Sequence, residues 1–202
     1  PLGHQIHVDG DRAVTTRVGE GSRPVTVLER DASGAWSVVD AFPMPGDSPA
    51  MQRWEFDYEN DLLVIGDVQD GGSSLTPRGP GRVIVVQKQG DSWVHIQTLF
   101  SSEPSVVPAG IGSTTDRFGE SVHLSGGRLA VGSLEPLLPE RDGHVESFQF
   151  DGTQFVREFV LLASDPFEPI FDNPNFGAGG AIADHSVIVG AIRQGDASGP
   201  VD

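Results

Sequence analysis

The stretch FGESVHLSGGRLAVG, from Phe118 to Gly132, decides the fold because it is repeated along the chain. A gapless match, FGAGGAIADHSVIVG, begins at Phe176. Two more degenerate copies come earlier, LGHQIHVDGDRAVTT from Leu2 and QRWEFDYENDLLVIG from Gln52. The copies start 50, 66 and 58 residues apart. This period is too long for ankyrin or leucine-rich repeats and is typical of a propeller blade.

Each copy predicts a β-hairpin. In the Phe118 copy, Val122 and Leu124 alternate with polar neighbours, which indicates a strand with one buried face. A second apolar run covers residues 129–131. Between the two runs lie two residues that tolerate positive φ, as a type I′ turn requires. These pairs are Gly10-Asp11, Asn60-Asp61, Gly126-Gly127 and Asp184-His185.

A second block, which predicts a third and a fourth strand, follows each of the first three copies. The third strand begins near Pro24, Gly81 and Gly143, and the turn into the fourth lies at Ser33-Gly34, Gly90-Asp91 and Asp151-Gly152. Trp36, Trp93 and Phe155 recur at one position, which favours core or inter-blade packing over a sugar-stacking platform. No segment shows a sustained helical period, and 26 glycines and 15 prolines also argue against helices.

The fold class predicted from this pattern is all-β, a partial β-propeller of four-stranded antiparallel blades. Residues 1–202 form a single incomplete propeller domain with three complete blades and the first half of a fourth. Because an open ring would expose strand edges and a blade face, we expect the parent chain or a neighbouring chain to supply the remaining blades. The expected blades are residues 2–50, 51–116, 117–174 and 175–202.

The third and fourth copies resemble the FG-GAP repeat. That repeat is named for a Phe-Gly at its start and a Gly-Ala-Pro-like segment after its second strand, here Gly132-Ser133-Leu134 and Gly190-Ala191-Ile192. The resemblance is weakest in the second copy, where Gln52-Arg53 replaces Phe-Gly. FG-GAP proteins include the integrin α-subunit head and many secreted bacterial proteins. The resemblance therefore implies a β-propeller, of the bacterial secreted type, that serves adhesion or ligand binding.

Calcium is the family property that these residues do not support. Many FG-GAP repeats carry an Asp-rich DxDxDG loop between strands one and two, whereas all four copies here have a two-residue turn. So short a turn cannot supply six to eight oxygen ligands. We therefore predict no cofactor and no metal site; DVQDGG at residues 67–72, with two carboxylates and a flexible turn, is an alternative place for calcium.

The composition of the chain limits its expected cellular location and its expected binding partners. The formal net charge is −16, which disfavours nucleic acid and anionic membrane surfaces because phosphates would be repelled. There is no cysteine, so disulfides and thiol chemistry are excluded. No segment approaches the roughly 20 apolar residues needed to cross a bilayer, and we expect no membrane insertion. Together with the resemblance, this predicts an extracellular or cell-surface protein.

A search for catalytic motifs finds no HExxH, GxSxG, P-loop or Cys/His cluster. His7 and His123 occupy equivalent places on the first strand, which favours a packing or surface role over catalysis or metal binding. Acidic residues in the crossovers could include a glycosidase-like carboxylate pair, but sequence cannot set their separation. They are Glu103, Asp116, Asp165 and Asp172. The sequence therefore predicts a protein that is not an enzyme.

Loop lengths predict which end of the propeller carries function. In an up-and-down blade, the short one-to-two and three-to-four turns share one end, and all the long connections share the other. Long loops on a rigid scaffold are where binding residues usually lie, and these loops mix acids with arginines. The predicted ligand-binding residues are Asp67, Asp70, Arg78, Glu135, Arg141, Asp142, Arg193 and Asp196.

The function expected from the sequence is a secreted or cell-surface, non-catalytic propeller that binds a protein or glycan through the long-loop face. One alternative is the propeller of an extracellular polysaccharide-degrading enzyme. Another is a structural subunit of an extracellular assembly, whose open blade is covered by a neighbouring chain.

Overall fold

The structure is a computed structural model, and it describes residues 2–17, 24–43, 54–68, 81–102, 117–134, 143–162, 174–183 and 186–193. Every regular element within these ranges is a β-strand, and no helix occurs in them. The strands form four antiparallel sheets, of four, four, four and two strands, and each sheet follows the order of the chain. The fold is therefore the predicted partial propeller, with three whole blades and half of a fourth.

The sheets are numbered here as they occur along the chain. Sheet 1 contains β1 (Leu2–Asp9), β2 (Arg12–Arg17), β3 (Pro24–Arg30) and β4 (Trp36–Pro43). Sheet 2 contains β5 (Trp54–Glu59), β6 (Leu62–Asp67), β7 (Arg82–Gln89) and β8 (Ser92–Leu99). Sheet 3 contains β9 (Ser121–Ser125), β10 (Arg128–Ser133), β11 (His144–Phe150) and β12 (Phe155–Leu162). Sheet 4 contains β13 (Pro174–Ala183) and β14 (Ser186–Arg193).

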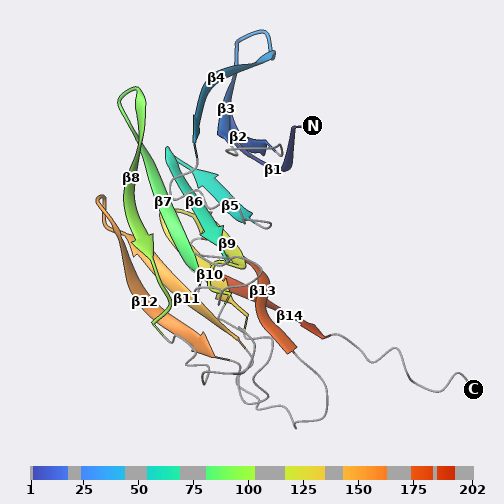
Figure 1. Cartoon of the computed structure of the whole chain (residues 1–202), viewed down its shortest axis with the longest axis vertical. Helices are drawn as coiled ribbons and strands as arrows, with labels where there is room; N and C mark the ends of the chain where they lie inside the picture. Colours follow the sequence, from blue (N-terminus) through green and yellow to red (C-terminus); the bar gives the residue numbers. More distant parts are fainter. Residues whose placement is uncertain are drawn as a thin grey trace, which may run out of the picture.

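Successive sheets pack against one another through their first strands. The principal contacts join β1 to β5, β5 to β9, and β13 to both β9 and β10. Figure 1 shows β8 and β12 along one side of the stack and β5, β9 and β13 toward the other. The four copies of the repeat thus occupy equivalent places, one in each sheet.

The turns between first and second strands are two residues long in sheets 1, 2 and 3. In sheet 2 both Asn60 (φ 49°) and Asp61 (φ 62°) are left-handed, and so are Gly126 (φ 59°) and Gly127 (φ 73°) in sheet 3, which confirms the type I′ prediction. The Gly10-Asp11 turn differs, because only the glycine has positive φ. The Asp184-His185 pair lies outside the described residues.

Three apolar clusters fill the spaces between successive sheets. Strand β6 is buried on both faces because its side chains alternate between two of these clusters. Leu63 and Ile65 pack toward sheet 1, whereas Leu62 and Val64 pack toward sheet 3. This double burial explains the unbroken apolar run at residues 62–65.

The Phe-Gly dipeptide has a clear structural role between sheets 2 and 3. Phe118 is fully buried, and its backbone forms a parallel bridge with Gly81. A Cβ on Gly66 would lie only 2.0 Å from the carbonyl oxygen of Gly119, so two glycine backbones touch where the sheets meet. The same contact recurs between sheets 3 and 4, where a Cβ on Gly132 would lie 1.9 Å from the oxygen of Gly177.

Polar side chains of one first strand also accept hydrogen bonds from the backbone of the next. Asp57 accepts from the Leu124 N–H at 2.7 Å, and Asp9 accepts from the Asn60 N–H at 2.9 Å. The Glu59 carboxylate accepts from the two N–H groups of the Gly126-Gly127 turn. These bonds fix the position of sheet 2 relative to sheet 1 and of sheet 3 relative to sheet 2.

The packing role predicted for the recurring aromatic position holds for two of three residues. Phe155 is buried in the cluster between sheets 2 and 3, and Trp93 is partly buried between sheets 1 and 2, where it stacks on Phe42 at 5.3 Å. For Trp36 the prediction is wrong. Its side chain is 41% exposed and lies under the guanidinium of Arg30.

Candidate functional site

The long connections attach to one end of the sheets, called here the long-loop end. The strands joined by residues 18–23, 69–80 and 135–142 meet there, as do those joined by 44–53, 103–116 and 163–173. The two-residue turns lie at the opposite, tight-turn end. This division follows from the antiparallel order of the strands and agrees with the prediction.

Two of the predicted ligand-binding residues belong to described strands. Arg193 is the last residue of β14, and its backbone pairs with Pro174. Asp67 ends β6, at the root of the segment 69–80. The remaining predicted residues, Asp70, Arg78, Glu135, Arg141, Asp142 and Asp196, lie outside the described residues, as do the crossover acids Glu103, Asp116, Asp165 and Asp172.

Asp67 is fully buried in an ion pair with Arg82, the first residue of β7. The Nε and Nη2 atoms of Arg82 lie 3.0 and 2.9 Å from Asp67 Oδ2. Because β6 and β7 flank residues 69–80, this pair joins the two roots of that segment. The Asp67 carboxylate therefore lies beneath the surface of the long-loop end.

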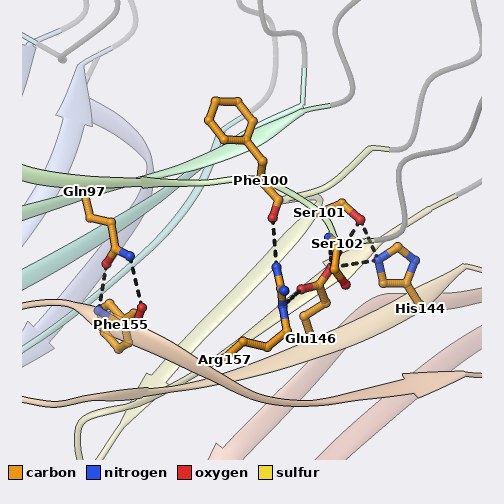
Figure 2. A network of polar contacts seen from close by, with 8 residues as sticks. All are labelled: Gln97, Phe100, Ser101, Ser102, His144, Glu146, Phe155 and Arg157. Carbon is orange, nitrogen blue, oxygen red and sulfur yellow. Dashed lines mark hydrogen bonds and ion pairs between the residues drawn. The ribbon is translucent and has the colours of Figure 1, made fainter.

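A larger polar network joins sheets 2 and 3 at the same end (Figure 2). At its centre is Glu146, a fully buried carboxylate on β11. The backbone N–H of Ser102 donates to Glu146 Oε1 at 2.7 Å, and the hydroxyls of Ser101 and Ser102 donate to the same oxygen at 3.2 Å. Arg157 Nε forms an ion pair with Oε2, and His144 Nε2 lies 3.3 Å from Oε1.

The environment of Glu146 favours its ionised form. Burial is the largest single influence and raises the pKa of Glu146. The hydrogen bonds from His144 and the Ser102 N–H, together with the charge of Arg157, outweigh burial and leave the pKa below its ordinary value of 4.5. A charged carboxylate thus contacts Ser102, which precedes the segment 103–116, and His144, which follows the segment 135–142.

The Ser101, His144 and Glu146 side chains resemble the residue types of a hydrolytic triad but not its geometry. In a triad, serine and carboxylate contact different nitrogens of the histidine ring. Here Ser101 Oγ (3.0 Å) and Glu146 Oε1 (3.3 Å) approach the same atom, His144 Nε2. Both serine hydroxyl and histidine are also held by the carboxylate itself. These contacts hold the Ser101–Ser102 backbone against β11, and their geometry differs from that of a triad.

A cleft of about 330 Å³ lies at the tight-turn end between sheets 1 and 2. Arg12 crosses it, donating to Glu29 Oε1 at 2.8 Å and to Tyr58 Oη at 3.3 Å and pairing with Asp61. The charged groups of the cleft are thus paired largely with one another. It is lined by Asp9, Asp11, Arg12, Glu29, Arg30, Tyr58, Asn60 and Asp61.

The two equivalent histidines lie on the first strands and flank Asp57. His7 Nδ1 is 2.8 Å from Asp57 Oδ1. Burial lowers the pKa of His123, and the nearby Asp57 and Glu55 carboxylates oppose that shift. In the part of the chain that the structure describes, no three His, Asp or Glu side chains are placed to share a metal ion.

Sequence reasoning missed the Glu146 network. Its members come from 101–102, the start of β11 and the middle of β12, and none belongs to a recognisable motif. The sequence feature that could have revealed this network is the group of polar residues His144, Glu146 and Ser147 in a strand that the repeat places inside the molecule.

Comparison of the sequence with models of known protein families and with curated proteins yields no match. Within the described ranges, no helix is long and apolar enough to span a bilayer.

Proposed function

We propose that this chain is a non-catalytic β-propeller module, secreted or displayed at a cell surface, that binds a protein or glycan through its long-loop end. The observation that carries the proposal is the placement of its two buried ionic anchors. The Asp67–Arg82 pair and the Glu146 network both lie at strand ends that flank long segments. Binding loops need fixed roots, because ordering a loose loop costs affinity.

The chemistry of the long segments suits a polar ligand. They carry carboxylates and guanidiniums in close succession, such as Glu140-Arg141-Asp142. Carboxylates accept hydrogen bonds from sugar hydroxyls or protein amides, and arginine donates in a fixed planar fork. The net charge of −16 further favours a ligand without phosphate or other dense negative charge.

The proposal can be tested with two matched triple variants. Asp70, Arg78 and Glu135 become serine in the first, which alters the long-loop end. Asp11, Arg30 and Asp91 become serine in the second, which alters the tight-turn end. Each variant removes two carboxylates and one guanidinium, so the change in net charge is equal. The probes are a glycan array and a panel of immobilised extracellular matrix proteins.

The wild-type chain should be retained on at least one glycan or matrix protein, and the long-loop variant should lose that retention. The tight-turn variant should bind as the wild type does. Equal loss in both variants, or no retention on any probe, would contradict the proposal. Release of reducing ends from a polysaccharide by the wild-type chain would instead support the enzymatic alternative.

A further inference from the structure

The two outer faces of the sheet stack expose residues that are buried at the equivalent positions of inner sheets. Equivalence is set by the repeat, whose hairpin register is shared by all four sheets. Glu59 pairs with Leu62 and Ser125 pairs with Arg128, as Ala183 does with Ser186. Exposure can therefore be compared position by position.

The leading face belongs to sheet 1 and is marked by Ile6 and Val8 on β1. Their side chains are 61% and 59% exposed. The equivalent pair in sheet 2, Phe56 and Tyr58, is buried against sheet 1. The equivalent pair in sheet 3, Val122 and Leu124, is buried against sheet 2. In the described chain, no sheet covers Ile6 and Val8.

The trailing face belongs to sheet 4 and is marked by Ile188 on β14, which is 68% exposed. Its equivalents are Val14, Val64 and Ala130 in sheets 1 to 3. All three are buried against the first strand of the following sheet. Ile188 thus has the position of a residue that receives a following sheet.

The glycine contact between sheets also indicates that sheet 4 has the surface that receives a following sheet. Gly190 is equivalent to Gly66 and Gly132, whose backbones touch the glycine of a following Phe-Gly. Among described atoms, a Cβ on Gly190 would approach only Gly179, within its own hairpin. In the first copy of the repeat the Phe-Gly position is Leu2-Gly3. The chain therefore carries both halves of the contact, one on each outer face.

We propose that the trailing face of one chain binds the leading face of a second copy of the same chain. Ile6 and Val8 of one copy pack on Ile188 of the other, and Gly3 lies against Gly190. The interface continues the one already formed between sheets 2 and 3 and between sheets 3 and 4. Because the two faces differ, association is head to tail, which produces closed rings or filaments. This inference does not depend on the function of the long-loop end.

The test is the mass of the 202-residue chain in solution, measured by light scattering and sedimentation velocity over a range of concentrations. The wild-type mass should rise with concentration above the 21.4 kDa of one chain. Like charges oppose association, so raising the salt from about 0.05 to about 0.5 M should strengthen it by screening. A mass that stays at 21.4 kDa throughout would overturn the proposal.

Two variants test the pairing of faces. Ile6→Asp damages only the leading face and Ile188→Asp only the trailing face, so each alone should weaken self-association about tenfold or more, because a carboxylate would be desolvated. An equimolar mixture should form a one-to-one dimer, since each variant retains the face that its partner needs. Variants that failed to fold could not complement each other, so recovery in the mixture also shows that both are folded.

The control is Leu162→Asp, which changes a 66% exposed residue of sheet 3, an inner sheet. It should associate as the wild type does. Two results would overturn the head-to-tail interface: self-association of Ile6→Asp or Ile188→Asp at wild-type strength, or a mixture of folded variants that remains monomeric. Equal loss in Leu162→Asp would show that the surface contact lies elsewhere.

Discussion

Replacing Gly66 with alanine should separate sheets 2 and 3. The added Cβ would lie 2.0 Å from the Gly119 carbonyl oxygen, where ordinary contact begins near 3.4 Å, so one sheet must move by about 1.4 Å. All three nearest atoms belong to the backbone of Gly119 and cannot rotate away. The movement opens the apolar cluster that contains Val64 and Phe118. Gaps of only about 0.5–1 Å already lose a quarter to a half of the dispersion energy.

The expected loss is about 3 kcal/mol, at the upper end of the usual cost of overpacking. For a chain of this length that corresponds to a fall in Tm of about 6–12 °C. The assay is thermal denaturation followed by circular dichroism. Gly179→Ala is the matched control, since it adds the same methyl group on a strand where no described atom lies within 4 Å. Equal melting temperatures for Gly66→Ala and Gly179→Ala would refute the glycine contact between sheets.

Three further predictions concern the Glu146 network, the turns and metal. Glu146→Gln should lower stability by about 2 kcal/mol, whereas Glu158→Gln, which breaks the partly exposed pair with Arg128, should cost about 0.5 kcal/mol or less. Because the folded pKa of Glu146 lies below 4.5, its contribution is complete above that pH and declines below it, so the difference in Tm between wild type and Glu146→Gln should narrow on acidification. Gly126→Val should cost about 1–3 kcal/mol, since a β-branched residue is strained at φ 59°; unchanged melting would count against the turn assignment. A chelator should shift Tm by less than about 1 °C, because the two-residue turns offer too few oxygens for calcium, and a large fall would disprove this.

The hairpins could be predicted because they depend on neighbouring residues. Asn60-Asp61 and Gly126-Gly127 have the φ angles that their residue types favour. The roles of Asp67 and Trp36 could not be predicted in the same way. Asp67 is buried because Arg82 reaches it across a strand pair. Trp36 is exposed because its equivalents Trp93 and Phe155 pack on the preceding sheet, and no sheet of the described chain precedes sheet 1.

The candidate site could likewise be predicted only in part. The order of the strands assigns every long connection to one end of the sheets. That order can be predicted from the repeat, because the short turns depend only on the φ preferences of their own residues. The Glu146 network is different. His144 and Arg157 reach Glu146 within sheet 3, whereas Ser101 and Ser102, 45 and 44 residues away in the chain, meet it only when sheet 3 packs on sheet 2. Local torsion preferences set the hairpins and their period. Which polar groups are buried, and which apolar ones stay in water, depends on the neighbouring sheet, because burial is a property of two packed surfaces.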